Sequence, residues 1–366
     1  MKLRSSKMLV SWYLSSSRLK HLLASLVYFI AGRINLYCRF KPKDFIGAYS
    51  RLCEIYGQMP LMRTYMDLLT SFFVYGYLPY EYVSFGFLGK EKAERHKYVS
   101  DSEMVKFASL LNDWKYEHIC NNKSHTYEFF KPYYRRMQIQ VRNSNDRDAF
   151  NQISKGHSIL FAKPIIGYAG NGARMIHISQ ENLNEIFDNL ISRKGGYVLE
   201  EPIEQCPEMS SLSSDSVNTV RYATIFDGKT VRCLYTLLRC GRKGACVDNI
   251  GAGGICVAID VDTGKTIPPA FGRNGGRYEK HPDTGVDFSE FVVPRWNELK
   301  MLADQLARKL PQLRYLGWDF AITKNGVILV EANATAQMGG FQILKGEGQR
   351  NNLKKILTEL FEEQKV

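Results

Sequence analysis

The 366-residue sequence lacks any pair of cysteines at the Cys-x-x-Cys spacing that is typical of zinc sites and thiol redox motifs. Its eight cysteines are scattered along the chain, which favours free thiols in a reducing compartment over a disulfide framework. Internal repeats and low-complexity segments are also absent. With 45% hydrophobic and 23% charged residues, the composition is that of an ordinary globular protein and argues against intrinsic disorder.

Long hydrophobic runs are missing as well. The apolar run at residues 22–31 has ten residues, which is too few to cross a bilayer as a helix. A secretion signal is disfavoured, because no small-x-small cleavage site follows this run. We therefore expect a cytoplasmic location.

Positive charge is concentrated at the amino terminus. Residues 1–60 contain ten Lys or Arg and two acids, so they supply +8 of the net charge of +12. One interpretation is a helix that packs on the core and exposes a basic face to solvent. Another is a peripheral contact of residues 1–40 with the inner membrane face, with Trp12 and Tyr13 at the interface and the cations toward anionic lipid. Nucleic acid is not expected as a partner, since the basic residues form no known reader motif.

Two parts of the chain differ in pattern. Residues 1–114 are aromatic-rich and predict a mostly helical region. From residue 155 onward, β-branched runs alternate with helical periods and glycine turns, which predicts an α+β or α/β architecture. Strands are expected at 158–163, 174–178, 197–200, 219–226, 231–239, 254–260, 316–323 and 327–331, and helices at 183–190 and 295–309. Asn325 and Gly326 predict a tight hairpin between the last two strands.

A glycine-rich loop follows the first of these strands. Lys163 ends the strand, and the loop runs on to Gly170 and Gly172. Glycines let backbone N–H groups turn toward phosphate oxygens, and a lysine adds positive charge. The pattern is neither the P-loop nor the dinucleotide fingerprint, since both of those open a helix. An ordinary hairpin loop remains the alternative.

A second motif is the strand at residues 197–200, which ends in Glu200, Glu201 and Pro202. A strand end with free backbone groups, an apolar wall and a carboxylate can hold adenine and ribose. An ordinary strand terminus is the alternative interpretation.

The hairpin near the end of the chain carries the most specific signal. Asp319 lies on its first strand, and Glu331 and Asn333 lie at the end of its second strand. Antiparallel pairing across Asn325 and Gly326 brings the two acids opposite each other, and alternation places Asn333 on the same face. Two carboxylates and an amide oxygen are ligands that Mg²⁺ prefers. An acid pair without a cation would be repulsive and costly to bury.

In this order, the pieces resemble the ATP-grasp superfamily over residues 115–345. The resemblance implies an α+β ATP-grasp fold, in which two α+β subdomains grip ATP, preceded by the helical region. It divides the chain into 1–114, 115–204 with the central and ATP-lid subdomains, and 205–366 with the magnesium site. The implied cofactors are ATP and Mg²⁺. ATP binding is implied for Lys123, Lys163, Gly170, Gly172, Glu200, Glu201, Ile203 and Glu208, and magnesium binding for Asp319, Glu331 and Asn333.

Several further segments resemble the sugar-transfer-associated subgroup, namely 218–222, 238–242, 247–254, 281–285 and 317–319. Members of the superfamily typically join a carboxylate to an amine through an acyl phosphate and release ADP. The resemblance implies a catalytic role for Arg221, Arg239, Arg242 and Asn249, with the arginines neutralising the transferred phosphoryl group. Asn249 and the glycines up to Gly254 would close over the acyl phosphate, and Gly253 and Gly254 would contact the substrate. His281 and Asp283 would contact the acceptor, or else serve as ordinary loop residues.

The chain departs from the family pattern at two positions. Gly317 stands where many ATP-grasp ligases have an arginine two residues before the first metal acid, and Ala334 replaces the start of a Pro-Gly turn. Both departures concern the acceptor site. The expected function is an ADP-forming carboxylate–amine ligase in polysaccharide or glycoconjugate biosynthesis, with small-molecule substrates linked to a sugar. A kinase acting on a hydroxyl and a non-catalytic ATP-binding scaffold are the alternatives.

Overall fold

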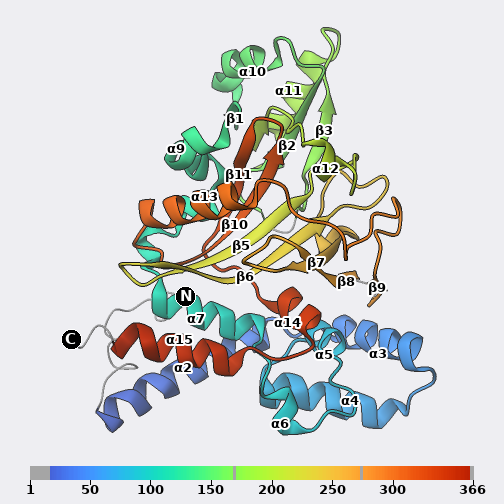
Figure 1. The fold of residues 1–366 in the computed structure, drawn as a ribbon, viewed down its shortest axis with the longest axis vertical. Helices are drawn as coiled ribbons and strands as arrows, with labels where there is room; N and C mark the ends of the chain where they lie inside the picture. The colour runs from blue at the N-terminus through green and yellow to red at the C-terminus, as the bar shows by residue number, and fades with distance from the viewer. Residues whose placement is uncertain (1–16, 168–169, 273–274, 363–366) are drawn as a thin grey trace. The chain divides into compact units, whose positions relative to one another are not determined.

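The computed structural model describes residues 17–167, 170–272 and 275–362 (Figure 1). The chain forms two compact units, one of residues up to Asp113 together with those from Thr335 onward, and one of Trp114–Ala334. The helical region expected at 1–114 therefore also takes in the carboxy-terminal end of the chain. The division of the remainder between residues 204 and 205 stays a prediction.

The first unit is helical, as the sequence predicts. Its main helices are α2 (Arg18–Cys38), α3 (Pro42–Tyr56), α4 (Leu61–Thr70), α5 (Pro79–Ser84), α6 (Lys92–Arg95), α7 (Asp101–Leu111), α14 (Gly339–Lys345) and α15 (Arg350–Glu362), with a π-helical turn η2 (Ser71–Tyr75) after α4. Buried Gln342 of α14 accepts from the amide of Val99 at 2.8 Å and donates to its carbonyl at 2.9 Å. Arg350 of α15 pairs with Glu103 of α7. These contacts explain why the two ends of the sequence share one unit.

Two findings concern the whole described chain. All eight cysteines are free thiols, which confirms the expectation from their spacing. Within the described ranges, no helix combines the length and the apolar character that crossing a bilayer requires. Trp12 and Tyr13 lie outside the described residues.

The second unit contains a small sheet and a large sheet. The small sheet has the strand order β1 (Gln138–Val141), β4 (Tyr197–Glu200), β2 (Ile159–Pro164) and β3 (Arg174–His177), all antiparallel. Helices α10 (Arg147–Ser154) and α11 (Leu183–Ser192) accompany it, and Phe150 and Phe187 from these helices pack together in its core. The described segments η3 (Trp114–Tyr116), α8 (His118–Asn121) and α9 (Lys123–Tyr134) precede this sheet.

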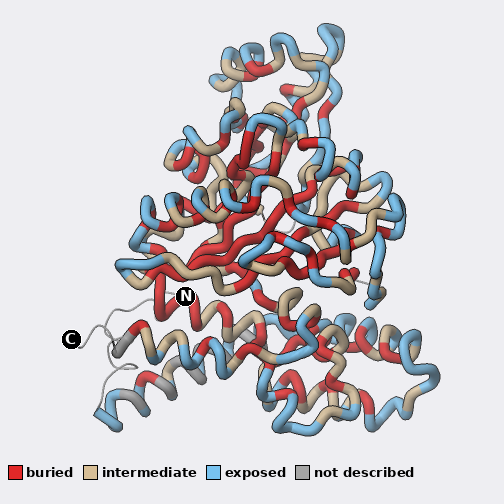
Figure 2. Tube along the Cα trace, viewed as in Figure 1, coloured by how far each residue is buried: buried red, intermediate tan, exposed pale blue. Residues whose placement is uncertain are grey.

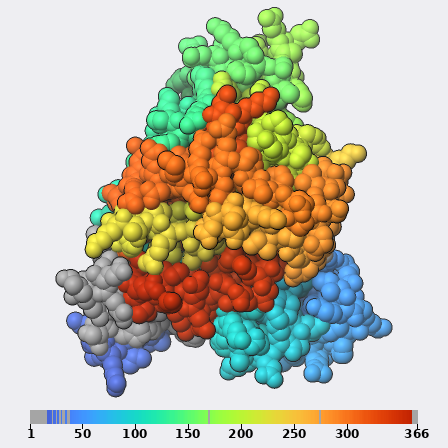
Figure 3. All heavy atoms as spheres, viewed as in Figure 1, coloured from blue at the N-terminus to red at the C-terminus, as the bar shows by residue number. Residues whose placement is uncertain are grey.

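The large sheet is antiparallel and has the order β11 (Gly326–Asn333), β10 (Tyr315–Thr323), β5 (Thr219–Phe226), β6 (Val231–Cys240), β7 (Ile255–Ile259), β8 (Thr266–Gly272) and β9 (Arg277–Tyr278). Helix α13 (Trp296–Lys309) packs against β5, β6, β10 and β11. Its other side reaches the surface, where Met301 is exposed and the atoms of this region are orange in Figure 3.

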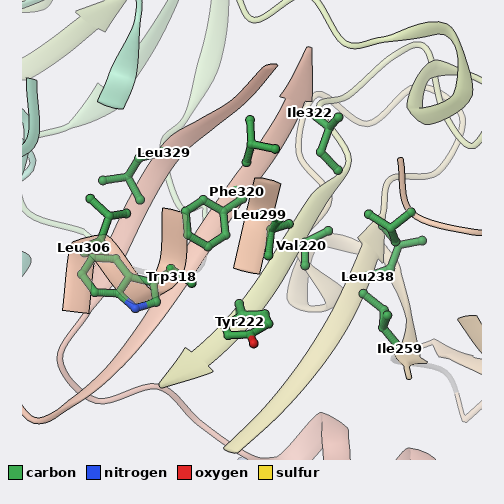
Figure 4. Close-up of a cluster of buried hydrophobic side chains, with 14 of the residues drawn as sticks. Val220, Tyr222, Leu238, Ile259, Leu299, Leu306, Trp318, Phe320, Ile322 and Leu329 are labelled. Carbon is green, nitrogen blue, oxygen red and sulfur yellow. The ribbon is translucent and has the colours of Figure 1, made fainter. Parts of the chain in front are cut away.

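The core beneath α13 fixes which side chains point away from it. Val220 and Tyr222 of β5, Leu238 of β6, and Trp318 and Phe320 of β10 belong to one buried hydrophobic cluster with Leu299 and Leu306 of α13 (Figure 4). Successive strand residues point to opposite faces. Residues 221, 239 and 319 therefore project from the face opposite this cluster, and the site begins with them.

All eight predicted strands and both predicted helices form within two residues of their expected ends. The sequence did not indicate β1, β8 or β9. Strand β8 contains Pro268 and Pro269, and proline within an apolar run argues against a central strand because it cannot donate to the ladder. The structure resolves this conflict with a register shift opposite the prolines, since Ala258 pairs with Ile267 and Cys256 with Phe271.

Candidate functional site

The two acids of the β10–β11 hairpin lie opposite each other, where the turn chemistry predicts them. Asp319 pairs in register with Glu331. The register then shifts at Val330, and such a bulge re-aims the side chains beside it. Asn333 lies two residues beyond Glu331, with Nδ2 3.4 Å from Oδ2 of Asp319. Two carboxylates and an amide therefore converge at one end of the hairpin.

Two arginines from the neighbouring strands neutralise Asp319. Arg221 of β5 donates from Nε to Oδ1 at 2.5 Å and from Nη2 to Oδ2 at 2.9 Å. Arg239 of β6 donates from Nη1 to Oδ2 at 3.3 Å. Burial by itself would raise the pKa of Asp319, but Arg221 and then Arg239 hold that pKa below its ordinary value. Asp319 is therefore an ionised carboxylate at neutral pH.

Lys123 connects this end of the large sheet with the small sheet. Its Nζ lies 3.5 Å from Oε1 of Glu331 and donates to the carbonyl of Gly167 at 2.9 Å. Its backbone amide donates to the carbonyl of Ile165 at 3.2 Å. Asn122 caps the helix that starts here by accepting from two backbone amides. The lysine that the sequence assigns to ATP thus lies between the start of the glycine loop and an acid of the hairpin.

A buried ion-pair network surrounds Glu200 at the end of β4. Its carboxylate, with 3% of the side chain exposed, accepts from Arg136 at 2.8 and 3.1 Å and from Nζ of Lys163 at 3.1 and 3.2 Å. Burial alone would raise the pKa of Glu200, but Arg136 and Lys163 lower it to about 2. Nη1 of Arg136 also donates to the carbonyl of Leu329 in β11 at 2.9 Å. The Glu200 carboxylate thus orders Lys163, and its predicted contact with the nucleotide stays a prediction.

The remaining predicted hinge residues lie on the segment after β4. The amide of Glu201 donates to the carbonyl of Met137 at 3.2 Å, and its carboxylate accepts from the amide of Met137 at 2.8 Å. Ile203 is half-buried in the extended segment that follows. Glu208 is exposed in the short helix α12 (Pro207–Ser210), and no interaction among the described residues joins it to the acid hairpin.

The glycine loop approaches the segment after β6. Gly170 and Gly172 have φ values of +71° and +77°, and a Cβ on Gly170 would lie 3.5 Å from Val247. In that segment, Asn249 accepts from the amide of Gly251 at 2.7 Å and caps the turn η5 (Ile250–Ala252). Gly253 has a φ of +100°, and a Cβ on Gly254 would meet the carbonyl oxygen of Asp248 at 2.3 Å. The glycine loop and the segment that contains Asn249 therefore lie against each other.

Arg242, Asp283 and His281 form a second cluster of their own. Arg242 binds the Asp283 carboxylate through Nε at 2.5 Å and Nη2 at 2.9 Å, and this pair lowers the pKa of Asp283 to about 2. His281 is buried, with Nε2 3.0 Å from the carbonyl oxygen of Gly241. Burial lowers the pKa of His281, so the ring is neutral at neutral pH. The structure thus separates Arg242 from the two arginines on Asp319.

Two residues of this region were not among the predicted site residues. Arg136 was missed because a single arginine ahead of a four-residue strand has no spacing that marks it. Asp248 is half-buried and accepts from the amide of Thr219 at 2.9 Å and from its hydroxyl. Burial raises the pKa of Asp248, while Arg239 opposes that rise. Its position directly before Asn249, in a glycine-rich segment, is the sequence feature that could have identified Asp248 as a site residue.

The donor set at the hairpin end fits magnesium. Glu331 has 32% of its side chain exposed, so its oxygens can reach a ligand, and the two other donors lie beside it. Among the described residues, no group of three or more His, Cys, Asp or Glu side chains could hold a metal ion. A site here would therefore rely on the Asn333 amide and on ligands such as phosphate oxygens and water, which is how Mg²⁺ is commonly held.

Comparisons with known proteins found matches among solved structures. No curated protein matches it in sequence. Among solved structures, the D-alanine–D-alanine ligase from Helicobacter pylori matches with 16% identity and a TM-score of 0.41, over 72% of this chain and 70% of that one. The VanG D-Ala:D-Ser ligase from Enterococcus faecalis matches with 12% identity and a TM-score of 0.44, over 70% and 63%. The N5-carboxyaminoimidazole synthetase from Staphylococcus aureus, complexed with ADP, matches with 13% identity and a TM-score of 0.41, over 66% and 53%.

The family comparison covers most of the chain. The family described as "Sugar-transfer associated ATP-grasp" matches residues 103–358. This range includes both sheets, the glycine loop and the acid hairpin. The chain therefore belongs to the sugar-transfer associated ATP-grasp family.

Proposed function

We propose that the protein is an ATP- and magnesium-dependent ligase that joins a carboxylate to an amine and releases ADP. The substrates that we propose are linked to a sugar or a sugar precursor, in polysaccharide or glycoconjugate biosynthesis. The observation that carries this proposal is the position of Lys123, whose Nζ lies between Glu331 and the glycine-loop carbonyl of Gly167. Lys123 thus joins an acid of the large sheet to the loop that follows a strand of the small sheet.

The roles follow from this arrangement. Asp319, Glu331 and Asn333 would hold Mg²⁺, which would neutralise charge on the phosphates when bound. Lys123 and Lys163 would contact phosphate oxygens as point charges. Arg221 and Arg239 would stabilise the negative charge that develops when a substrate carboxylate attacks the γ-phosphate. No protein nucleophile is needed for this chemistry.

The segments around the glycine loop would protect the intermediate. An acyl phosphate hydrolyses in water, so a ligase must exclude water while the amine attacks. The approach of Gly170 to Val247 brings the loop beside the segment that contains Asn249 and Gly254. We assign the second cluster, Arg242 with Asp283 and His281, to the acceptor side of the site.

Glu331→Gln gives the cleanest test, because Glu331 is the more exposed of the two proposed carboxylate ligands. Calorimetric titration with ATP, with and without Mg²⁺, should show that wild type binds more tightly with magnesium. The variant should lose this magnesium-dependent gain by about tenfold or more, as is typical for groups that support a metal site. Glu290→Gln, which changes an exposed acid on the loop before α13, should behave as wild type.

Two outcomes would count against the proposal. If neither protein binds nucleotide, the site assignment fails. If ATP binds but turnover yields a stable phosphoester without an amine, the protein is a kinase instead. A ligase forms ADP and phosphate only when both the acid and the amine are present.

A further inference from the structure

Helix α2 exposes an apolar face along its length. Apart from the adjacent Leu22 and Leu23, the exposed large side chains follow one another at three or four residues, which places them on one side of the helix. They are between 43% and 68% exposed, and we call them the α2 stripe: Leu19, Leu22, Leu23, Leu26, Ile30 and Ile34. At a rise of about 1.5 Å per residue, the stripe is roughly 22 Å long.

The packing of α2 within its own unit does not account for this stripe. Ala24, which is fully buried, lies on the other side of the helix, Val27 at the edge of the stripe is half-buried, and α2 packs against α7. The helix therefore has one apolar side for the core and another for solvent. Figure 2 shows the beginning of α2 in the colour of exposed residues. Contiguous exposed apolar patches on monomeric proteins usually mark a site of interaction.

Exposed cations accompany the stripe. Arg18 and Lys20 are exposed at the start of α2, and Arg39, Lys41 and Lys43 are exposed directly after it. Across residues 1–60, ten Lys or Arg stand against two acids. A leucine-rich helix face with flanking Lys and Arg matches a helix that lies in a membrane interface and is attracted by anionic lipid.

We propose that the α2 stripe docks on a lipid bilayer that contains anionic lipid, with α2 in the plane of the interface. A second copy of the chain fits less well, because a symmetric contact through the stripe would bring the cations of both copies together. Nucleic acid would leave six large apolar side chains without a partner. The described helices cannot cross a bilayer, so the contact is peripheral.

Vesicle flotation tests the proposal with the full chain. Wild type should float with vesicles of phosphatidylcholine and phosphatidylglycerol, float less with phosphatidylcholine alone, and lose binding as salt is raised. Leu22→Asp combined with Leu26→Asp should reduce binding by about tenfold or more, since it places two charges on the apolar face. Lys41→Glu combined with Lys43→Glu should weaken binding only to the anionic vesicles.

Controls separate loss of docking from loss of folding. All four substituted side chains are exposed, so circular dichroism and the melting temperature should stay close to wild type. Met301→Asp, at a side chain that is 73% exposed on α13, should float as wild type does. Equal flotation of wild type and the Leu22, Leu26 variant would overturn the proposal. The proposal would also be overturned if neither protein floated and wild type were a dimer that the Leu22, Leu26 variant converts to a monomer. The stripe would then bind a second copy of the chain.

Discussion

Asp319→Asn is expected to lower the free energy of unfolding by about 3–5 kcal/mol, because it leaves buried cations without their counter-ion. Arg221 is buried and donates two hydrogen bonds to this carboxylate, and Arg239 donates a third. The same substitution should remove the magnesium-dependent part of ATP binding. Asp319 thus differs from Glu331, whose loss should affect binding with little effect on stability.

Urea unfolding at neutral pH measures this effect. Asp304→Asn serves as the matched control, since Asp304 forms an exposed ion pair with Arg308 on α13 and should change stability by less than about 1 kcal/mol. Adding Arg221→Met to Asp319→Asn should restore part of the lost stability, because the uncompensated charge is removed with its partner. If Asp319→Asn were as stable as wild type, Arg221 and Asp319 would not be the buried pair described above.

Glu200→Gln should produce a second large loss of stability, and this one should depend on pH. In the folded protein the pKa of Glu200 is lowered from 4.5 to about 2, chiefly by Arg136 and Lys163 acting against burial. Glu200 therefore contributes stability that is fully present above pH 4.5 and is lost as the pH falls toward 2. At neutral pH the variant should be about 3–5 kcal/mol less stable than wild type.

The measurement is the difference in unfolding free energy between wild type and Glu200→Gln over a pH series. This difference should be largest at neutral pH and should shrink in the acid range. Glu94→Gln, which removes an exposed ion pair with Lys97, should give a difference of less than about 1 kcal/mol at neutral pH. A constant difference between wild type and Glu200→Gln across the series would contradict the assigned network.

Local patterns account for the parts of the fold that the sequence predicts well. The β10–β11 hairpin follows from Asn325, Gly326 and an alternating apolar pattern, all within twenty residues. Once that turn forms, strand geometry alone brings Asp319 opposite Glu331. The arginines on Asp319 follow from strand pairing as well, since Asp319 pairs in register with Arg221.

Contacts between distant segments could not be predicted in the same way. Glu200 and Arg136 are 64 residues apart, and their pairing depends on β1 lying beside β4, although no pattern in the sequence indicated β1. The sequence also predicted a basic solvent face for the amino-terminal helix as one interpretation. The structure leaves Arg18 and Lys20 exposed and also turns leucines and isoleucines of α2 to solvent, because the face that contacts α7 is set by tertiary packing.

The network around Glu200 has a consequence for nucleotide affinity. A free lysine side chain loses about 1.5–2 kcal/mol of rotamer entropy when a partner immobilises it. Lys163 is already immobilised, since its ammonium group lies 3.1–3.2 Å from both carboxylate oxygens of Glu200. The entropy cost of ordering this side chain is therefore part of the folding free energy and does not arise again when a ligand binds. A phosphate that reaches Lys163 would meet a preorganised cation, and more of its electrostatic attraction would remain as binding free energy.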